Sequence, residues 1–390
     1  MNQLISPQSK SPFSPGLPAL YSVAFLSGIS LGLFNPFIST LMAQHQVDDV
    51  WIGANSTVYF IFIALGTPLV SKILRQIGLR RTMILGFALM GLSAPLFPLT
   101  NQLPLWFVIR AVMGFSCCLY LISGQTALNY FCNDSNRSIV NGLDALSFSL
   151  GFGMGPIIGS VFYEISPQIT FSLGSLLVLS GIAVVLVGLP EKVIDFQRPQ
   201  IKVFKKLILP LQGAFAYGFS VATLVSLYPV YLLGKNYGVE QIGYTFAVFI
   251  AGGLLATIPV THLADKFGKL KVLGTTVFIV VLSLVGLSLV ENQVVTQIFA
   301  FIAGASMSPV FPLSLALIGA KLSRDKLPSG TVLFTGTYSA GCTAGPLLSS
   351  VVMQVFSDRY IFSLMLILFV IFLLKLIKTI KKMGLKFHYY

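Results

Sequence analysis

Long apolar runs separated by short polar or charged segments make up most of the chain. A helix that crosses the ~30 Å hydrocarbon core of a membrane needs about 20 mostly apolar residues. Twelve segments meet this requirement, and Pro, Gly and charged residues mark their ends. They cover residues 17–43, 51–73, 82–100, 104–130, 138–163 and 169–190, and then 207–233, 241–263, 271–290, 294–320, 329–354 and 359–380. The pattern predicts an all-α membrane protein with twelve transmembrane helices.

The two sets of six segments share landmarks at a constant offset of 190 residues. At this offset the following residues coincide: Gly53 with Gly243, Gly78 with Gly268, Gly114 with Gly304, Gly151 with Gly341, and Gly155-Pro156 with Gly345-Pro346. A fixed order of five landmarks indicates a duplication. We therefore expect two pseudo-symmetric six-helix halves, residues 1–190 and 207–390, joined by a charged cytoplasmic linker at 191–206. Such proteins usually place a small-molecule path between the halves.

Composition and charge support a membrane protein and set its orientation. The chain is 55% hydrophobic and 9% charged, whereas a soluble domain carries about 25% charged residues. The net charge of +13 lies in short loops, so we expect no nucleic-acid partner. The outer loops hold only Lys235 and Arg359, which predicts that both termini lie in the cytoplasm, with the chain in the inner (plasma) membrane. The basic tail from Lys378 is expected at the lipid surface.

Features of enzymes and metal sites are missing from the sequence. The four cysteines lack CxxC spacing and have no histidine cluster nearby, and there is no G-x-x-x-x-G-K-[ST] loop or catalytic triad. The three histidines lie near or beyond the ends of the spans: His45, His262 and His388. We therefore expect a monomer that is not an enzyme and uses no cofactor or metal, with its energy supplied by an ion gradient.

Motifs in three regions resemble the major facilitator superfamily, and the resemblance covers nearly the whole chain. The loop after the eighth span matches the family signature at Leu263, Ala264, Asp265, Gly268, Lys269 and Lys271. The loop after the second span keeps Gly78, Arg80 and Arg81, but has Arg75 where the family usually has Asp. Arg110 and Gly114 match the Arg-x-x-x-Gly pattern of the fourth helix. The fifth-helix pattern typical of the family's drug–proton antiporters is met by Gly142, Gly151, Gly155, Pro156 and Gly159, with Ser160 in place of its last glycine.

The two signature loops are expected to act as cytoplasmic gates. Asp265 would accept hydrogen bonds at a neighbouring helix N-terminus, where the helix dipole favours an anion. Lys269 or Lys271 would balance its charge, and Gly78, Arg80 and Arg81 form the first-half counterpart. The alternative is that these cations serve only the positive-inside bias.

Glycines at intervals of four predict a small, tightly packed helix face in each half. Gly151, Gly155 and Gly159 share one face of the fifth span, and small residues let helices approach closely. Pro156 removes a backbone hydrogen bond and can kink the helix. The eleventh span repeats the arrangement with Gly341, Gly345 and Pro346. We expect a bendable seam between the halves; ordinary helix packing is the alternative.

Polar residues inside the spans are the candidates for the transport path, because intramembrane charges are costly and mark pathways. One stripe of the fourth span carries Arg110, Gly114, Cys118, Leu121, Gln125 and Asn129. We expect this stripe to face a central cavity, with Arg110 and Gln125 contacting substrate or water. A structural role of Arg110 in capping helix ends is the alternative. Further cavity candidates are Asn35, Gln212, Tyr217 and Tyr338.

Asp144 is the one acidic residue within the predicted spans. We expect it either to carry protons or to pair with a cytoplasmic Arg or Lys. The sequence as a whole predicts a secondary transporter that works by alternating access, with a small-molecule substrate, protons and membrane lipids as partners. An apolar, aromatic cavity with few charges favours proton-coupled efflux of an amphipathic or weakly polar compound. The alternatives are a proton-coupled importer of a sugar or similar nutrient, and a non-transporting sensor.

Overall fold

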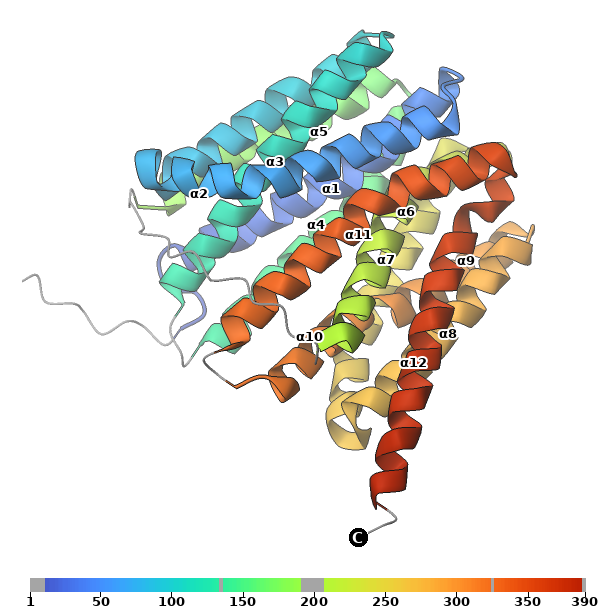
Figure 1. Cartoon of the computed structure of the whole chain (residues 1–390). Coiled ribbons are helices and arrows are strands. Elements are labelled where there is room, and N and C mark those ends of the chain that lie inside the picture. Colours follow the sequence, from blue (N-terminus) through green and yellow to red (C-terminus); the bar gives the residue numbers. More distant parts are fainter. Residues whose placement is uncertain (1–10, 133–135, 191–206, 324–325, 388–390) are drawn as a thin grey trace, which may run out of the picture. The chain divides into compact units, whose positions relative to one another are not determined.

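The computed structural model describes residues 11–132, 136–190, 207–323 and 326–387, and within these ranges all regular structure is helical (Figure 1). The first six α-helices are α1 (Leu17–Gln44), α2 (Asp49–Ser93), α3 (Leu103–Phe131), α4 (Arg137–Tyr163), α5 (Pro167–Gly188) and α6 (Ile208–Gly234). The next six are α7 (Val239–Phe267), α8 (Lys269–Leu289), α9 (Gln293–Met307), α10 (Val310–Lys321), α11 (Leu327–Val355) and α12 (Ser363–Phe387). The 3₁₀ helices η1 (Ala94–Leu99) and η4 (Asp358–Phe362) precede α3 and α12.

Two helices differ from the predicted spans. The spans at 51–73 and 82–100 are joined in α2, which is interrupted only at Gly78, with φ 81° and ψ 170°. Glycine adopts this backbone conformation without the steric penalty that other residues suffer. The span at 294–320 is divided into α9 and α10 at Pro309, which precedes α10 and has no N–H to continue the α9 ladder. With α2 counted twice and α9–α10 counted once, the helices correspond to the twelve predicted spans.

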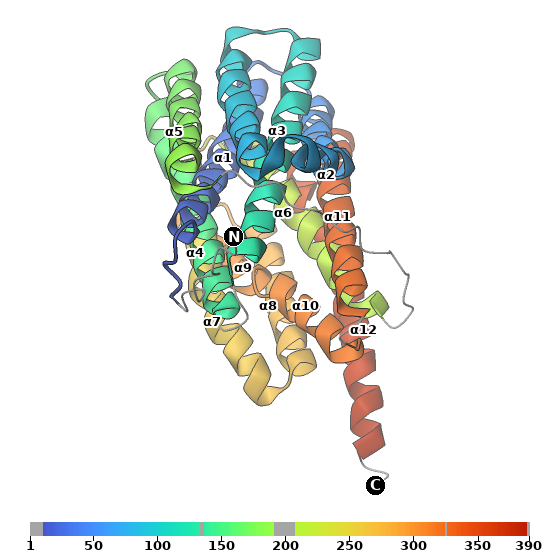
Figure 2. The same cartoon turned by 90° about the vertical axis from the view of Figure 1, so that its left-hand side faces the viewer.

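Length and hydropathy independently identify ten membrane-span candidates in the described ranges. One of them, Asp49–Leu99, has 51 residues, far more than the about 20 needed for one crossing. It therefore accounts for two crossings, which are divided at Gly78, and Figure 2 shows α2 and α3 in the same part of the molecule. The helix α11 is not among the ten, and it carries Gly, Ser and Thr along its length.

The helices group into two compact units. The first contains residues 1–34 and 61–196, and the second contains residues 35–60 and 197–390. The end of α1 and the start of α2 thus pack with the helices of the C-terminal half. The predicted linker at 191–206 lies outside the described residues.

Direct backbone contact between α1 and α4 organises the first unit. A Cβ atom built on Gly28 would lie 2.1 Å from the Phe148 carbonyl oxygen, and one on Gly151 would lie 2.0 Å from the Phe25 carbonyl oxygen. Gly155 is similarly close to the backbone of Leu33, at 2.7 Å. Only glycine fits at such positions, because any side chain would push the two helices apart.

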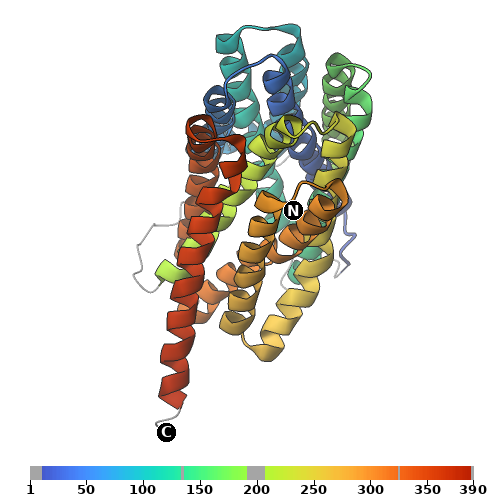
Figure 3. The same cartoon turned by 90° about the vertical axis from the view of Figure 1, so that its right-hand side faces the viewer.

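The second unit repeats this contact between α6 and α11. A Cβ atom on Gly218 would lie 2.3 Å from the Tyr338 carbonyl oxygen, and one on Gly341 would lie 2.4 Å from that of Phe215. Each of these residues is the counterpart, at the offset of 190, of a residue in the α1–α4 contact. Figure 3 shows α12 running beside α8 in the same unit, in agreement with the contacts between these helices.

The expected seam between the halves therefore needs correction. The closest contacts of Gly151 and Gly155 lie on α1, and those of Gly341 and Gly345 lie on α6, so each seam joins two helices of one half. The glycine periodicity identifies a small helix face, but it carries no information about which helix covers that face. Gly159 lies at the end of the same face, where its carbonyl accepts a hydrogen bond from Thr170 on α5, and Pro156 and Pro346 lie inside their helices.

Candidate functional site

Four aromatic side chains from three helices meet in the second unit and are called here the aromatic cluster. They are Tyr217 of α6, Phe311 of α10, and Phe334 and Tyr338 of α11. The rings of Tyr217 and Tyr338 stack with their centroids 6.0 Å apart and an interplanar angle of 27°. Phe311 lies 5.6 Å from Tyr217 and 5.3 Å from Tyr338, and Phe334 lies 5.0 Å from Phe311. Two predicted cavity residues, Tyr217 and Tyr338, are thus brought together.

The α6–α11 backbone contact positions this cluster. Gly218, next to Tyr217, lies against the Tyr338 carbonyl. The backbones of α6 and α11 are therefore in direct contact at the point from which the two tyrosine side chains extend. Phe334 is fully buried among Leu207, Ala214 and Ile318 and anchors the cluster to the core. Both tyrosines are only partly buried, and the Tyr338 side chain is hydrogen-bonded to that of Cys342. One side of the cluster is therefore fixed by packing, while its tyrosine rings remain partly accessible.

Arg110 is completely buried in α3. One turn away, Trp106 donates its indole N–H to the Phe97 carbonyl at 2.9 Å and stacks on the Phe97 ring at 5.4 Å. Farther along α3, the Tyr120 hydroxyl lies 3.0 Å from that of Ser30 on α1. A guanidinium inside a transmembrane bundle is costly and typically functional, so Arg110 remains the strongest charged candidate in the first unit.

The predicted stripe on α3 changes its surroundings along its length. At its middle, Cys118 lies against Gly66 of α2, and its sulfur is 3.9 Å from the Thr67 hydroxyl. At its far end Gln125 and Asn129 are exposed, and the Asn129 side chain donates to the Gln125 carbonyl at 3.0 Å. The Asn129 amide is therefore engaged with its own helix. That the stripe faces a central cavity stays a prediction.

Two other cavity candidates lie in different surroundings from the aromatic cluster. Asn35 is buried in α1, just before Pro36, and its carbonyl accepts a hydrogen bond from Ser39 at 3.3 Å. Gln212 precedes Tyr217 by five residues, so it points about 140° away around α6. It lines a groove between α6, α10 and α12 instead.

Asp144 is half-buried on α4 and lies within electrostatic range of the Tyr21 hydroxyl on α1. That hydroxyl donates a hydrogen bond to the Pro12 carbonyl at 2.7 Å. Across the described part of the chain, Asp144 forms no ion pair with Arg or Lys. The structural alternative, pairing with a cation, is therefore not realised among these residues, and proton carriage stays a prediction.

The two predicted gating loops share an unusual glycine conformation. Gly268 has φ 95° and ψ 128°, and Gly78 also has positive φ. Arg80 extends from the first loop and donates to the Leu186 carbonyl at the end of α5, and the neighbouring Arg81 is exposed. In the second loop, the Asp265 side chain pairs with neither Lys269 nor Lys271 within the described ranges. Among these residues the lysine part of the expected latch is not formed, and hydrogen bonding of Asp265 at a neighbouring helix N-terminus stays a prediction.

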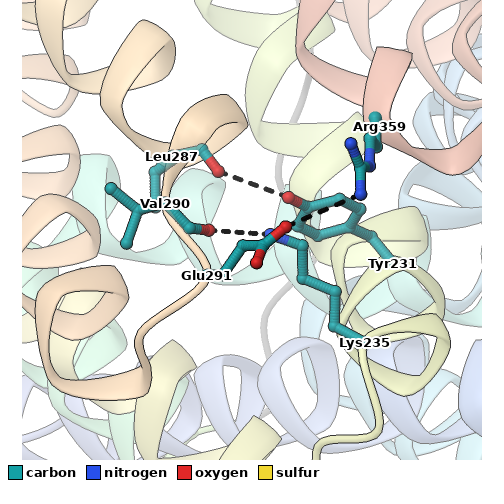
Figure 4. Close-up of polar contacts among 6 residues, drawn as sticks. All are labelled: Tyr231, Lys235, Leu287, Val290, Glu291 and Arg359. Carbon is teal, nitrogen blue, oxygen red and sulfur yellow. Dashed lines mark hydrogen bonds and ion pairs between the residues drawn. The ribbon is translucent and has the colours of Figure 1, made fainter.

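A polar cluster missed by the sequence analysis joins the α6–α7, α8–α9 and α11–α12 connections (Figure 4). Lys235 donates to the Val290 carbonyl at 2.8 Å and lies 4.9 Å from the centre of the Tyr231 ring. Glu291 and Arg359 approach to 3.6 Å, and Tyr231 donates to Leu287 at 3.3 Å. Burial lowers the pKa of Lys235. The signal available in the sequence was unlike charges in successive loops, and these residues border a cavity of about 360 Å³.

The start of α2 contacts α11 within the second unit. A Cβ atom on Gly53 would lie 2.0 Å from the Ser350 hydroxyl and 2.6 Å from the Pro346 carbonyl oxygen. One turn later, Thr57 forms hydrogen bonds with the α11 backbone. This contact explains why residues 35–60 group with the C-terminal half.

Comparison with known proteins identifies relatives along the whole chain. The Major Facilitator Superfamily profile matches residues 20–212 and 211–383. The chain is 26% identical over 358 residues to the "Uncharacterized MFS-type transporter YcaD" of Shigella flexneri serotype 5b, covering 90% of this chain and 92% of that protein. The YcaD protein of Escherichia coli strain SE11 is 25% identical over the same share.

Solved structures of low sequence identity share the fold. A mutant of the nucleoside transporter NupG gives a TM-score of 0.80 at 12% identity, covering 93% of this chain and 99% of that chain. A bacterial homolog of the human lysosomal transporter Spinster, inward-facing and unoccupied, gives 0.73 at 13% identity, covering 87% of this chain and 82% of that chain. These likenesses confirm the predicted all-α transporter fold.

The family match extends over both halves, the fold agrees, and the helices account for repeated membrane crossings. The predictions of a multi-pass integral membrane protein, of a secondary transporter with a small-molecule substrate and of a protein that is not an enzyme are confirmed. The chain belongs to the major facilitator superfamily of membrane transporters.

Proposed function

We propose that the protein exports an amphipathic or weakly polar compound in exchange for protons. Residues 1–190 and 207–390 act as the two halves, joined by residues 191–206, and expose the transport site to either side of the membrane in turn. The observation that carries the substrate class is the aromatic cluster, in which the rings of Tyr217 and Tyr338 stack and remain partly accessible.

The chemistry of the cluster suits a flat or amphipathic solute. Aromatic faces bind apolar and planar groups, and phenol hydroxyls add single hydrogen bonds without bringing a charge. The faces also attract organic cations. The backing from Phe311 and Phe334 is apolar, so a highly charged solute would lose its hydration there without compensation.

Asp144 and Arg110 are the proposed charged elements of the cycle. Asp144 forms no ion pair among the described residues, and it lies on the helix that carries the antiporter-like glycine pattern. It is therefore the proposed proton carrier. Arg110, with Gln125, Asn129 and Asn35, is proposed to contribute to the polar side of the cavity.

The positive-inside bias supports a cytoplasmic location for both termini. On this basis the end of the second unit that carries Lys269, Lys271 and Lys321 faces the cytoplasm, and the end that carries Lys235 faces outward. The proposed location is the inner membrane, and the proposed state is a monomer.

The test uses purified protein in liposomes with a trapped pH dye and an imposed pH gradient. Organic cations, dyes, sugars and organic anions are added one at a time. Efflux by exchange predicts that a substrate drives protons out of acid-inside vesicles, and that Tyr217→Ala and Tyr338→Ala weaken the response. Tyr360→Ala removes an exposed tyrosine and serves as the matched control.

A different response would favour another function. Proton entry together with solute uptake would establish an importer, and the flat tyrosine pair would then bind the ring of a sugar-like or similar nutrient. Failure of every solute to move protons, with thermal stabilisation by one of them, would indicate a sensor. An unchanged response in both tyrosine variants would remove the aromatic cluster from the site.

A further inference from the structure

A groove on the second unit is lined at one end by three lysines and is called here the lysine groove. It has a volume of about 340 Å³, and its lining is Ile208, Leu209, Gln212, Lys321, Lys375, Lys378 and Thr379. These residues come from the start of α6, the end of α10 and the last part of α12. Among the described residues, the lining carries three lysines and no carboxylate, so these side chains concentrate positive charge in the groove.

The start of α6 adds to this positive potential. Its N-terminal flanking residue, Leu207, supplies no side-chain cap to the first turn. The first N–H groups of a helix have no partners within the helix and carry the positive end of its dipole. An anion in the groove would therefore meet the lysines and a helix N-terminus at the same place.

A second, mostly apolar cavity, called here the channel, adjoins the groove and is lined by α6, α11 and α12. This second cavity, of about 310 Å³, shares Ile208 and Gln212 with the first and extends past Phe215, Ala216, Leu368 and Ile371. From Lys378 to Leu368 the α12 axis advances ten residues, or about 15 Å at 1.5 Å per residue. That is half of a ~30 Å hydrocarbon core, the depth of a single lipid leaflet.

We propose that the lysine groove binds an anionic phospholipid, with the phosphate between Lys321, Lys375 and Lys378 and an acyl chain along the channel that ends near Leu368 and Phe215. The charge at one end selects an anion, and the leaflet-deep apolar channel selects a lipid over a free phosphate ion. Basic pockets between transmembrane helices bind anionic headgroups in this way. The bound lipid bridges three helices of the second unit and does not depend on which solute is transported.

The test measures lipid binding to the purified full-length protein. Phosphatidylglycerol, phosphatidylcholine with the same acyl chains, and inorganic phosphate are titrated separately, with bound lipid counted by native mass spectrometry. We expect phosphatidylglycerol to bind and phosphatidylcholine to bind much more weakly. Equal binding of the two lipids would overturn the proposal, as would displacement of phosphatidylglycerol by millimolar phosphate.

Charge variants locate the site. In Lys321→Gln/Lys375→Gln/Lys378→Gln we expect phosphatidylglycerol affinity to fall by about a hundredfold, since each lysine near an anionic headgroup contributes about a factor of five. The matched control is Lys266→Gln/Lys326→Gln/Lys381→Gln, which removes three exposed lysines from the same end of the unit, none of them lining the groove. An equal loss of phosphatidylglycerol affinity in the two triple variants would show that the lipid is attracted by surface charge in general, and it would overturn the proposal.

A third variant tests the channel without changing charge. Ile371 is exposed in the channel wall, and Ile371→Trp fills the acyl path while leaving the lysines intact. We expect weaker binding of long-chain phosphatidylglycerol and unchanged binding of a short-chain form, with an unchanged melting temperature as the check on folding. If the long-chain form binds as before, the channel holds no acyl chain.

Discussion

The Thr57 hydroxyl donates a hydrogen bond to the Thr343 carbonyl at 3.0 Å and accepts one from the Leu347 N–H at 3.2 Å. Thr343 and Leu347 are four residues apart in α11, the spacing at which a carbonyl and an N–H pair in a regular α-helix. A side chain of α2 therefore joins the backbone ladder of α11 beside Pro346. If the protein works by the proposed alternating access, this contact is a candidate for one that separates during the cycle.

The first prediction concerns Gly53, one turn before Thr57. A Cβ atom there would lie 2.0 Å from the Ser350 side chain and 2.6 Å from the Pro346 carbonyl oxygen. We expect Gly53→Ala to separate the start of α2 from α11 and to lower the transport rate at least about tenfold, a loss of about 1.4 kcal/mol. Transport in liposomes measures the effect. Gly336→Ala on α11, where a Cβ meets nothing within 4 Å, is the control and should keep full activity.

The second prediction concerns the repeated glycine contacts. In Gly151→Ala and Gly341→Ala the new methyl group meets a backbone carbonyl, at 2.0 Å and 2.4 Å. Overpacking typically costs about 1–3 kcal/mol, and we expect both variants to melt at lower temperature than Gly142→Ala, whose Cβ is unobstructed. If all three proteins melt together, the helices separate without cost and the seams do not stabilise the halves.

The third prediction separates backbone strain from crowding at Gly268. Its φ of 95° is unfavourable for any other residue, yet a Cβ there meets nothing within 4 Å. We expect Gly268→Ala to destabilise the α7–α8 turn by about 1–3 kcal/mol through strain alone. Hydrogen exchange at the turn provides the measurement, and unchanged protection of the turn amides would show that the backbone relaxes.

The fourth prediction concerns Arg110. Because its side chain is completely buried, Arg110→Gln changes the interior of the first unit and should abolish transport while the protein still inserts and folds. The control is Arg359→Gln, since Arg359 lies in an ion pair whose side chains are 72% and 79% exposed; exposed pairs contribute little. Normal transport by the Arg110 variant would assign this arginine a purely structural role.

The fifth prediction concerns coupling. Asp144→Asn removes the titratable group from α4 while preserving its size, so transport should lose its dependence on the pH gradient and continue only down the solute gradient. Asp48→Asn, a change at an exposed carboxylate, should leave coupling intact. The ratio of protons to solute moved in liposomes decides whether Asp144 carries protons or has a structural role. An unchanged ratio in Asp144→Asn would show that its role is structural.

Much of the fold could be predicted from sequence patterns that depend only on each helix by itself. Apolar runs marked the spans, and the fixed offset of the glycines marked the duplication, because both express requirements of each helix alone. The helix that covers each glycine face depends on three-dimensional packing, which the sequence pattern does not reveal. We therefore expected Gly151 in a seam between the halves, whereas in the structure it packs on Phe25 of α1.

The candidate site was predicted less completely for the same reason. Tyr217 and Tyr338 were recognised singly, but their stacking depends on the approach of α6 to α11 at Gly218. The hydrogen bond from Lys235 to the Val290 carbonyl and the pairing of Glu291 with Arg359 join loops that are distant in sequence. No periodicity within one helix predicts such an encounter.

The position of the Thr57 hydroxyl has a consequence for reversibility. If α2 withdraws from α11 in the proposed cycle, the Thr343 carbonyl and the Leu347 N–H remain one helical turn apart and can bond to each other. The Thr57 hydroxyl can likewise turn to a carbonyl of its own helix, as threonine does in many helices. Separation of the two helices would therefore leave no polar group without a partner in a medium without water, so the proposed cycle could break and re-form this contact at low enthalpic cost.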